Sequence, residues 1–167
     1  FEHVKEKYRN LNIRVVENQV YENSNCCESA RLSINNTLNN KIILCNGSVL
    51  LLAEHLRAID LDKSSILTQA VSKKLEDFNI GVVSQDNKVQ NMSLGVKEKK
   101  WLEICYLSTK NDVKALHGIV GSIDFKNRFL FEAVNELIKS KPLTTVEVEK
   151  IKSYKIASIK SLNKVDI

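Results

Sequence analysis

Four cysteines are the residues whose type and spacing best suit chemistry in this chain. Cys26 and Cys27 are adjacent, Cys45 follows at moderate spacing, and Cys105 stands alone in the second half. An even number of cysteines permits two disulfides. A bond between the adjacent pair would close a strained ring, so one of the two is expected to pair with Cys45 and the other with Cys105. By loop closure, each bond would stabilise the fold by about 3–4 kcal/mol.

This disulfide hypothesis constrains the local structure. If one helix ran unbroken to Cys45, Cys27 and Cys45 would lie about 27 Å apart, which no disulfide spans. A pairing of these two residues therefore needs a break, which Asn39-Asn40 can supply as turn formers. Because disulfides persist in oxidising compartments, the pattern predicts a secreted, extracellular protein.

Other chemistry of these groups has less support in the sequence. A nucleophilic pair of Cys105 with His55 or His117 lacks any recognisable motif. Zinc binding by the other cysteines with His55 lacks the C-x₂-C spacing of zinc sites. Glu98 and Glu103 would not share a helix face, and no glycine-rich phosphate loop is present. The sequence therefore predicts no catalytic residue, no cofactor, no metal site and no enzymatic activity.

Several surface sites remain as candidates. Three Asn-X-Ser/Thr sequons mark Asn35, Asn46 and Asn91 as candidates for glycosylation in a secreted protein. Trp101 and Tyr106 are candidates for contact with a partner or a ligand, and ordinary packing is the alternative interpretation of the tryptophan. These five residues are the recognition sites that the sequence predicts.

The elements that would position these residues are predicted to be helices. Of the 167 residues, 43% are hydrophobic, and a single proline and five glycines leave few chain breakers. Three- and four-residue spacing of apolar residues predicts an all-α fold of seven to eight helices. The expected helices cover residues 2–22, 26–38, 49–61, 64–78, a segment around 97–105, a short helix capped at Ser108 or Thr109, residues 123–140, and a last helix from 144 or 145. Residues 82–95 are expected to be irregular.

Charge and hydropathy limit the partners. The net charge is +5, and the whole excess of basic residues lies after residue 83. That excess is spread over many positions rather than clustered with aromatics, so nucleic-acid binding is not expected. No apolar run of about 18 residues exists, so no membrane span is predicted.

A similar order of segments in the two halves suggests an internal repeat. Val49-Leu50-Leu51 precedes Phe129-Leu130-Phe131 by 80 positions, and Ser64-Ser65-Ile66 precedes Thr144-Thr145-Val146 by the same interval. In both halves an apolar segment leads through a short link to a Ser/Thr pair and a further amphipathic segment. We therefore expect two related helical units packed into one body, with residues 1–83 as the first and 84–167 as the second.

The cysteine spacing, the Asn/Lys/Ile-rich chain and the two-unit order resemble the bicycle family of secreted aphid effectors. Members of that family carry two Cys-Tyr-Cys motifs in successive similar regions. Cys105-Tyr106-Leu107 keeps the first two residues of such a motif, and Cys27-Glu28-Ser29 keeps the first. The resemblance implies an effector that is delivered into plant tissue and binds host proteins, and it supplies no catalytic residues.

Together these features predict a secreted helical effector or recognition protein that binds a host or partner macromolecule, here an unidentified protein, without catalysis. One alternative is a helical carrier of a small apolar ligand, lipid or odorant-like, held between helices 49–59 and 129–138. A further alternative is a helical-cytokine-like signal, which would have four long helices rather than seven or eight shorter ones.

Overall fold

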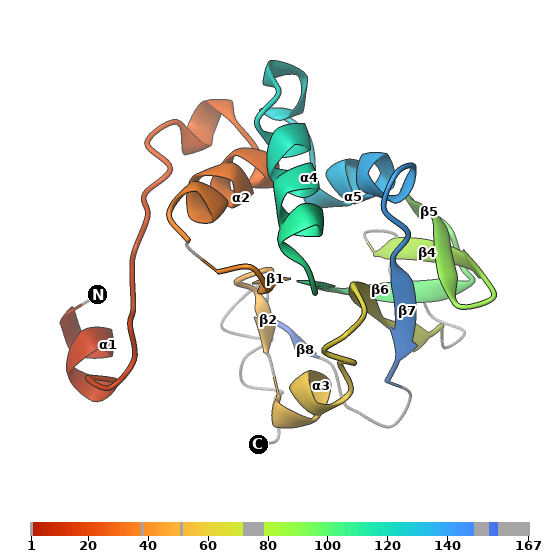
Figure 1. Ribbon diagram of the computed structural model, residues 1–167, viewed down its shortest axis with the longest axis horizontal. Helices are drawn as coiled ribbons and strands as arrows, with labels where there is room; N and C mark the ends of the chain where they lie inside the picture. The colour runs from red at the N-terminus through yellow and green to blue at the C-terminus, as the bar shows by residue number, and fades with distance from the viewer. Residues whose placement is uncertain (1, 38, 51, 72–78, 149–153, 157–167) are drawn as a thin grey trace.

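A six-stranded sheet and three helices form the body of the protein, which a computed structural model describes at residues 2–37, 39–50, 52–71, 79–148 and 154–156. The fold is therefore mixed α/β, and the predicted all-α architecture is wrong. Helices α2, α4 and α5 gather on one face of the sheet, while α3 lies toward the other (Figure 1). The helices are α1 (Glu2–Lys7), α2 (Cys26–Asn35), α3 (Ala53–Arg57), α4 (Lys110–Val120) and α5 (Leu130–Ile138), with 3₁₀ turns η1 (Tyr21–Asn23) and η2 (Ile123–Phe125). The strands are β1 (Ile42–Cys45), β2 (Val49–Leu50), β3 (Ser65–Ala70), β4 (Ile80–Gln85), β5 (Lys88–Leu94), β6 (Lys99–Leu107), β7 (Thr144–Glu147) and β8 (Tyr154–Lys155).

Strand β6 is the longest of the described strands and organises the sheet. The strand order is β1-β6-β3-β7-β5-β4, β4 also pairs with β6, and β2 and β8 form a separate two-stranded sheet. Strand β6 runs antiparallel to both β1 and β3, whereas β3 and β7 are parallel. Between β4 and β5, Asp86 and Asn87 have φ angles of 50° and 58°, as a two-residue hairpin turn requires.

Alternation along β6 sends its side chains into two cores. Trp101, Cys105 and Leu107 join the cluster under helices α2, α4 and α5, whereas Leu102 and Ile104 join the cluster on the opposite face. A strand buried on both faces reads as a nearly continuous apolar run. The segment also places Trp101, Ile104 and Cys105 at helical spacing, and that spacing predicts the helix that the strand replaces.

Other predicted helices are strands or are shorter. The segment 49–61 begins as strand β2 and continues as the short helix α3, while the segment 64–78 begins as strand β3. The segment from 144 begins as strand β7, and residues 82–95 are the paired strands β4 and β5. The parts of the predicted helices at 72–78, 149–153 and 157–162 lie outside the described residues.

Two helix predictions with clear capping residues are confirmed. Helix α2 begins after Asn25, whose side chain accepts a hydrogen bond from the Cys26 N–H. Helix α4 begins after Thr109, whose hydroxyl accepts from the Asp112 N–H. By contrast, the helix predicted at 2–22 ends at Lys7, and its apolar residues Val4 and Tyr8 are exposed. Asn25 and Thr109 therefore cap the helices expected of them, whereas the Ser64-Ser65 and Thr144-Thr145 pairs, also expected to begin helices, lead into strands β3 and β7.

The predicted division of the chain at residues 83 and 84 stays a prediction, although it falls inside strand β4 and the sheet contains strands from both sides of it. In the described part of the chain, none of the helices has the length and hydropathy needed to cross a membrane.

Candidate functional site

The candidate site is a cavity of about 540 Å³ between helix α2, the helix-facing side of β6 and the start of α5. Its size falls within the usual range for small-molecule sites. The walls come from α2, the turn after β1, the ends of the β4–β5 pair, β6 and the segment that opens α5. The lining residues are Cys26, Ser29, Ala30, Ser33, Leu44, Cys45, Asn46, Gly47, Ile80, Leu94, Trp101, Glu103, Phe129, Leu130 and Phe131.

Three aromatic side chains give the cavity its apolar surface. Trp101 is only 5% exposed, and its indole N–H donates to the Ile104 carbonyl at 3.1 Å. The rings of Phe129 and Phe131 are stacked, with their centroids 6.0 Å apart. Phe129 is 53% exposed. A large, half-exposed aromatic ring beside a cavity is a suitable contact for a ligand.

The adjacent cysteines join the start of α2 to the start of α5. The Cys26 sulfur accepts a hydrogen bond from the Leu130 N–H at 2.9 Å. The Cys27 thiol donates to the Phe129 carbonyl at 3.3 Å. All four cysteines are free thiols, so the predicted disulfides are wrong. The cysteine pair instead holds the aromatic segment of α5 beside α2, and the compartment, which the disulfides suggested, stays a prediction.

The thiols are poorly suited to nucleophilic catalysis. Burial raises the pKa of Cys105 to about 12, and burial together with the neighbouring Cys26 raises the pKa of Cys27 to about 12. Burial is also the main cause that raises the pKa of Cys26 and Cys45, and the Glu103 carboxylate adds to it in both. Since the thiolate is the reactive form, these groups stay largely neutral near pH 7 and are weak nucleophiles.

A thiol titration tests this correction. We expect four thiols in the unfolded protein without any reductant, and in the folded protein a fast reaction with a thiol reagent at the exposed Cys45. Cys27 and Cys105 are buried and should react only as the protein unfolds. Cys45→Ser should remove the fast phase alone. A count below four in unreduced, unfolded protein would show that disulfides form.

Glu103 brings the cavity its carboxylate. In the pairing of β3 with β6, Ile66 lies opposite Cys105 and Thr68 lies opposite Trp101. One residue separates the two positions on β3 and three separate them on β6, so β6 forms a bulge at this point. Glu103 lies at the centre of this bulge with a φ of 58°. A non-glycine residue pays about 1–2 kcal/mol for that conformation, and such strain is common at functional sites. Among the described residues that line the cavity, Glu103 is the only acidic or basic one apart from the thiols.

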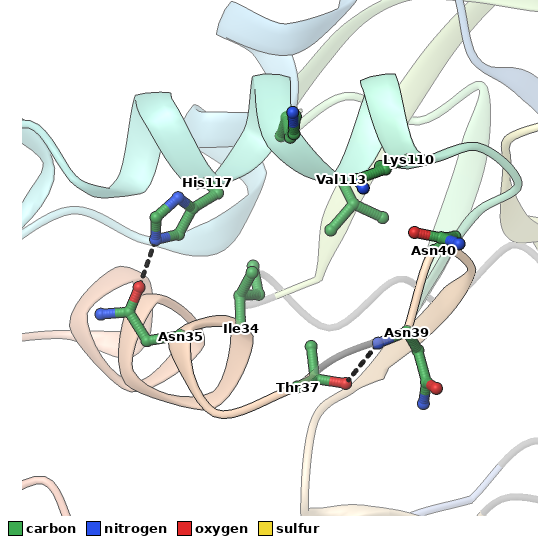
Figure 2. Close-up of a pocket in the computed structure, with 9 residues that line it drawn as sticks. Ile34, Asn35, Thr37, Asn39, Asn40, Lys110, Val113 and His117 are labelled. Carbon is green, nitrogen blue, oxygen red and sulfur yellow. Dashed lines mark hydrogen bonds between the residues drawn. The ribbon is translucent and has the colours of Figure 1, made fainter.

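A second, smaller hollow of about 360 Å³ lies between the C-terminal end of helix α2 and helix α4. Figure 2 shows His117 and Asn35 pointing toward one another across it, joined by a hydrogen bond. Its ionisable lining side chains are Lys110, Lys114 and His117. This hollow differs in charge from the aromatic cavity and shares no lining residue with it.

The structure places the predicted contact and glycosylation residues apart. Trp101 lines the aromatic cavity, whereas Tyr106 is buried on the opposite face of β6, where its hydroxyl donates to the Leu61 carbonyl. Asn35, Asn46 and Asn91 are all exposed, and their glycosylation stays a prediction. Sequence reasoning missed Glu103 as a cavity residue, and it considered Phe129 only as part of the segment 129–138 that would line the cavity of the alternative carrier. A signal for Glu103 was present, because an acidic residue interrupts the apolar run of β6.

Comparisons with known proteins give the fold a context. No protein-family model matches the chain, and no curated protein sequence does. The inositol-1-phosphate CTP transferase from T. maritima is similar over 97% of this chain and 68% of its own, with 15% identity and a TM-score of 0.74. The CTP:phosphocholine cytidylyltransferase from Streptococcus pneumoniae is similar over 98% and 71%, with 18% identity and a TM-score of 0.74. A nucleoside-diphosphate-sugar pyrophosphorylase from Vibrio cholerae has 11% identity and a TM-score of 0.67, over 98% of this chain and 74% of its own.

At such low identity these similarities establish the fold alone, which this chain shares with the two CTP transferases and the pyrophosphorylase. They contradict the resemblance to the bicycle effectors and the prediction of a non-catalytic recognition protein, because the similar structures are transferases and a pyrophosphorylase. The helical carrier and the cytokine-like signal fail with the all-α fold on which they depended. The prediction that the chain is not an enzyme is contradicted in the same way, because the similar structures are enzymes. The expected protein partner stays a prediction.

Proposed function

We propose that this chain takes part in nucleotidyl transfer and that the aromatic cavity holds the acceptor, a small alcohol that already carries a phosphate. In this reaction an oxygen of the acceptor's phosphate attacks the α-phosphorus of a nucleoside triphosphate. A new P–O bond forms, the bond between the α-phosphorus and the bridging oxygen breaks, and pyrophosphate leaves. The proposal is supported by the shared fold with two CTP-dependent transferases, named for inositol 1-phosphate and for phosphocholine.

The observation that carries the proposal is the composition of the cavity wall. A nucleoside triphosphate carries several negative charges, which proteins bind with Lys, Arg, backbone N–H groups or metal ions. Neither Lys nor Arg is among the described lining residues, and Glu103 is negative. The cavity is therefore better matched to the non-phosphate part of the acceptor than to the triphosphate.

A metal ion does not fit the described side chains. Divalent cations often neutralise charge in phosphate chemistry. Within the part of the chain that the structure describes, no three His, Cys, Asp or Glu side chains are grouped so that they could hold a metal ion. We therefore derive no step through a metal. What these residues can do is bind and orient the acceptor and exclude water from it.

The test is release of pyrophosphate from CTP in the presence of phosphocholine or inositol 1-phosphate. We expect release that depends on the phosphorylated alcohol, with unphosphorylated choline as a control that lacks the attacking phosphate. Ser33→Phe should fill the cavity and abolish release without changing the melting temperature, whereas Ser140→Phe, on an exposed residue outside the cavity, should leave it unchanged. No release above background with either acceptor would overturn the proposal.

A further inference from the structure

The aromatic wall offers ring surface rather than hydrogen bonds. The indole N–H of Trp101 is already donated to the Ile104 carbonyl at 3.1 Å, so Trp101 has no donor left for a ligand. The stacked rings of Phe129 and Phe131 have none either. Aromatic faces attract cations through their quadrupole, and tryptophan is the strongest of them. These three side chains therefore suit an apolar or cationic group.

The polar side chains of the wall are mostly engaged within the protein. The Ser33 hydroxyl donates to the Ser29 carbonyl at 2.8 Å, and the Ser29 hydroxyl accepts from the Asn18 side chain at 3.2 Å. The Asn46 side-chain oxygen accepts from both the N–H and the hydroxyl of Ser48. A polyol needs a partner for each hydroxyl that it buries. This wall offers a polyol few such partners.

Glu103 contributes negative charge to the cavity. The carboxylate of Glu103 acts on Cys26, which belongs to α2, and on Cys45, which ends β1; in each it adds to burial in raising the thiol pKa. Its field therefore reaches two other walls of the cavity. The raised pKa keeps both thiols neutral, so they add no charge of their own near pH 7. A positive group in the cavity would be attracted, and a second negative group repelled.

We propose that the cavity recognises an organic cation, an ammonium group carried by the acceptor, through the Glu103 carboxylate and the rings of Trp101, Phe129 and Phe131. This assignment rests on the proposed function for the identity of the ligand as an acceptor. It separates the two kinds of acceptor that the similar structures suggest equally well, because a trimethylammonium group matches the wall whereas a cyclic polyol does not. The cation needs no hydrogen-bond partners for its methyl groups, and its charge faces the carboxylate.

The experiment uses the single tryptophan of the chain, Trp101, as a reporter within the cavity. Choline is titrated into the protein and followed by Trp101 fluorescence and by calorimetry, beside 3,3-dimethylbutan-1-ol, which has the same shape without the charge, and myo-inositol. We expect choline to bind at least about tenfold more tightly than either neutral compound, as an ionic and cation–π contact in a partly buried site should allow.

Variants identify the groups responsible. Glu103→Gln should weaken choline binding about tenfold or more and leave 3,3-dimethylbutan-1-ol unaffected. Glu17→Gln, at an exposed acidic residue outside the cavity, is the matched control and should bind choline normally. If Glu103→Gln does not fold, Phe129→Ala provides the second variant, since its ring is half exposed and its loss should weaken choline binding several-fold.

The outcomes separate this inference from the proposed function. Equal binding of choline and its neutral analogue, tighter binding of myo-inositol, or a Glu103→Gln variant with unchanged choline affinity would each overturn the cation assignment. Pyrophosphate release with inositol 1-phosphate and no choline binding would overturn the assignment and leave the proposed function standing. Choline binding that requires Glu103, without any pyrophosphate release, would support the assignment and count against nucleotidyl transfer.

Discussion

Replacing Gly81 with alanine is expected to lower the free energy of unfolding by about 3 kcal/mol, which for a chain of this length corresponds to about 6–12 °C in melting temperature. A Cβ atom at Gly81 would lie 2.0 Å from the Val96 carbonyl oxygen and 2.6 Å from the Val96 carbonyl carbon. These are backbone atoms of the segment that joins β5 to β6, so they cannot move aside as a flexible side chain would. Either β4 or that segment must shift.

The shift would also reach the cavity. Ile80 precedes Gly81 in β4, and Leu94 ends β5 just before the crossing segment; both line the cavity. We therefore expect weaker choline binding as well as lower stability. Gly118→Ala is the matched control, because nothing lies within 4 Å of its added Cβ and it sits in helix α4, where alanine should stabilise by up to about 1 kcal/mol. Thermal unfolding by circular dichroism measures both, and an unchanged melting temperature for Gly81→Ala would contradict the close packing.

The sequence could predict those structural features that depend on residues close together in the chain. The caps Asn25 and Thr109 act within one helical turn, and the helices that they begin are where they were expected. The strands depend on partners far along the chain: Ile42 pairs with Leu107, and Ser65 pairs with Thr144. Apolar runs of this length fit a buried strand or a buried helix equally well. Single-sequence periodicity could not decide between them.

The apparent repeat shows how such a pattern misleads. Ser64-Ser65-Ile66 and Thr144-Thr145-Val146 were interpreted as the starts of two equivalent helices. They are instead neighbouring parallel strands, in which Ile66 lies opposite Thr145. The similarity between the segments therefore reflects a shared place in one sheet and gives no support for duplicated helical units.

Only some of the cavity residues could be predicted from the sequence, because the cavity also depends on contacts between distant segments. Trp101 was singled out as a contact residue, and it does line the cavity. Glu103 was set aside because on a helix it would have shared no face with Glu98, whereas on a strand it shares the cavity side with Trp101. The cysteine pair was noticed for its rarity, but its thiols bond to backbone groups of α5 about a hundred residues away, a contact that no local pattern encodes.

Asn135→Asp is expected to lower the free energy of unfolding at neutral pH by about 2–3 kcal/mol. The Asn135 side chain bonds both backbone groups of Met92: its oxygen accepts from the N–H at 2.8 Å, and its amide donates to the carbonyl at 2.7 Å. These two bonds attach α5, which carries Phe129–Phe131 at its start, to β5, which ends at Leu94. A carboxylate keeps the acceptor, loses the donor, and brings a negative charge against the Met92 carbonyl.

The pH dependence distinguishes this explanation from a general loss of packing. In the folded variant the charged form of the new carboxyl is disfavoured, so its pKa is raised above the value of about 3.9 in the unfolded chain. A group with a raised folded pKa contributes stability below its unfolded pKa and loses it as pH rises through the folded pKa. The loss of unfolding free energy relative to the native protein should therefore be small below about pH 4, where the protonated carboxyl can donate to the Met92 carbonyl. This loss should grow as the pH rises toward neutral.

Asn111→Asp supplies the matched comparison, because Asn111 is an exposed residue on α4 and the same substitution there leaves Met92 untouched. Denaturant unfolding of the two variants and the native protein at a series of pH values measures the difference. A deficit for Asn135→Asp that is constant between pH 3 and pH 7 would mean that the lost donor and the new charge are not the cause. Since the bridge positions two walls of the cavity, the same pH series should show choline affinity falling together with stability as the introduced carboxyl ionises.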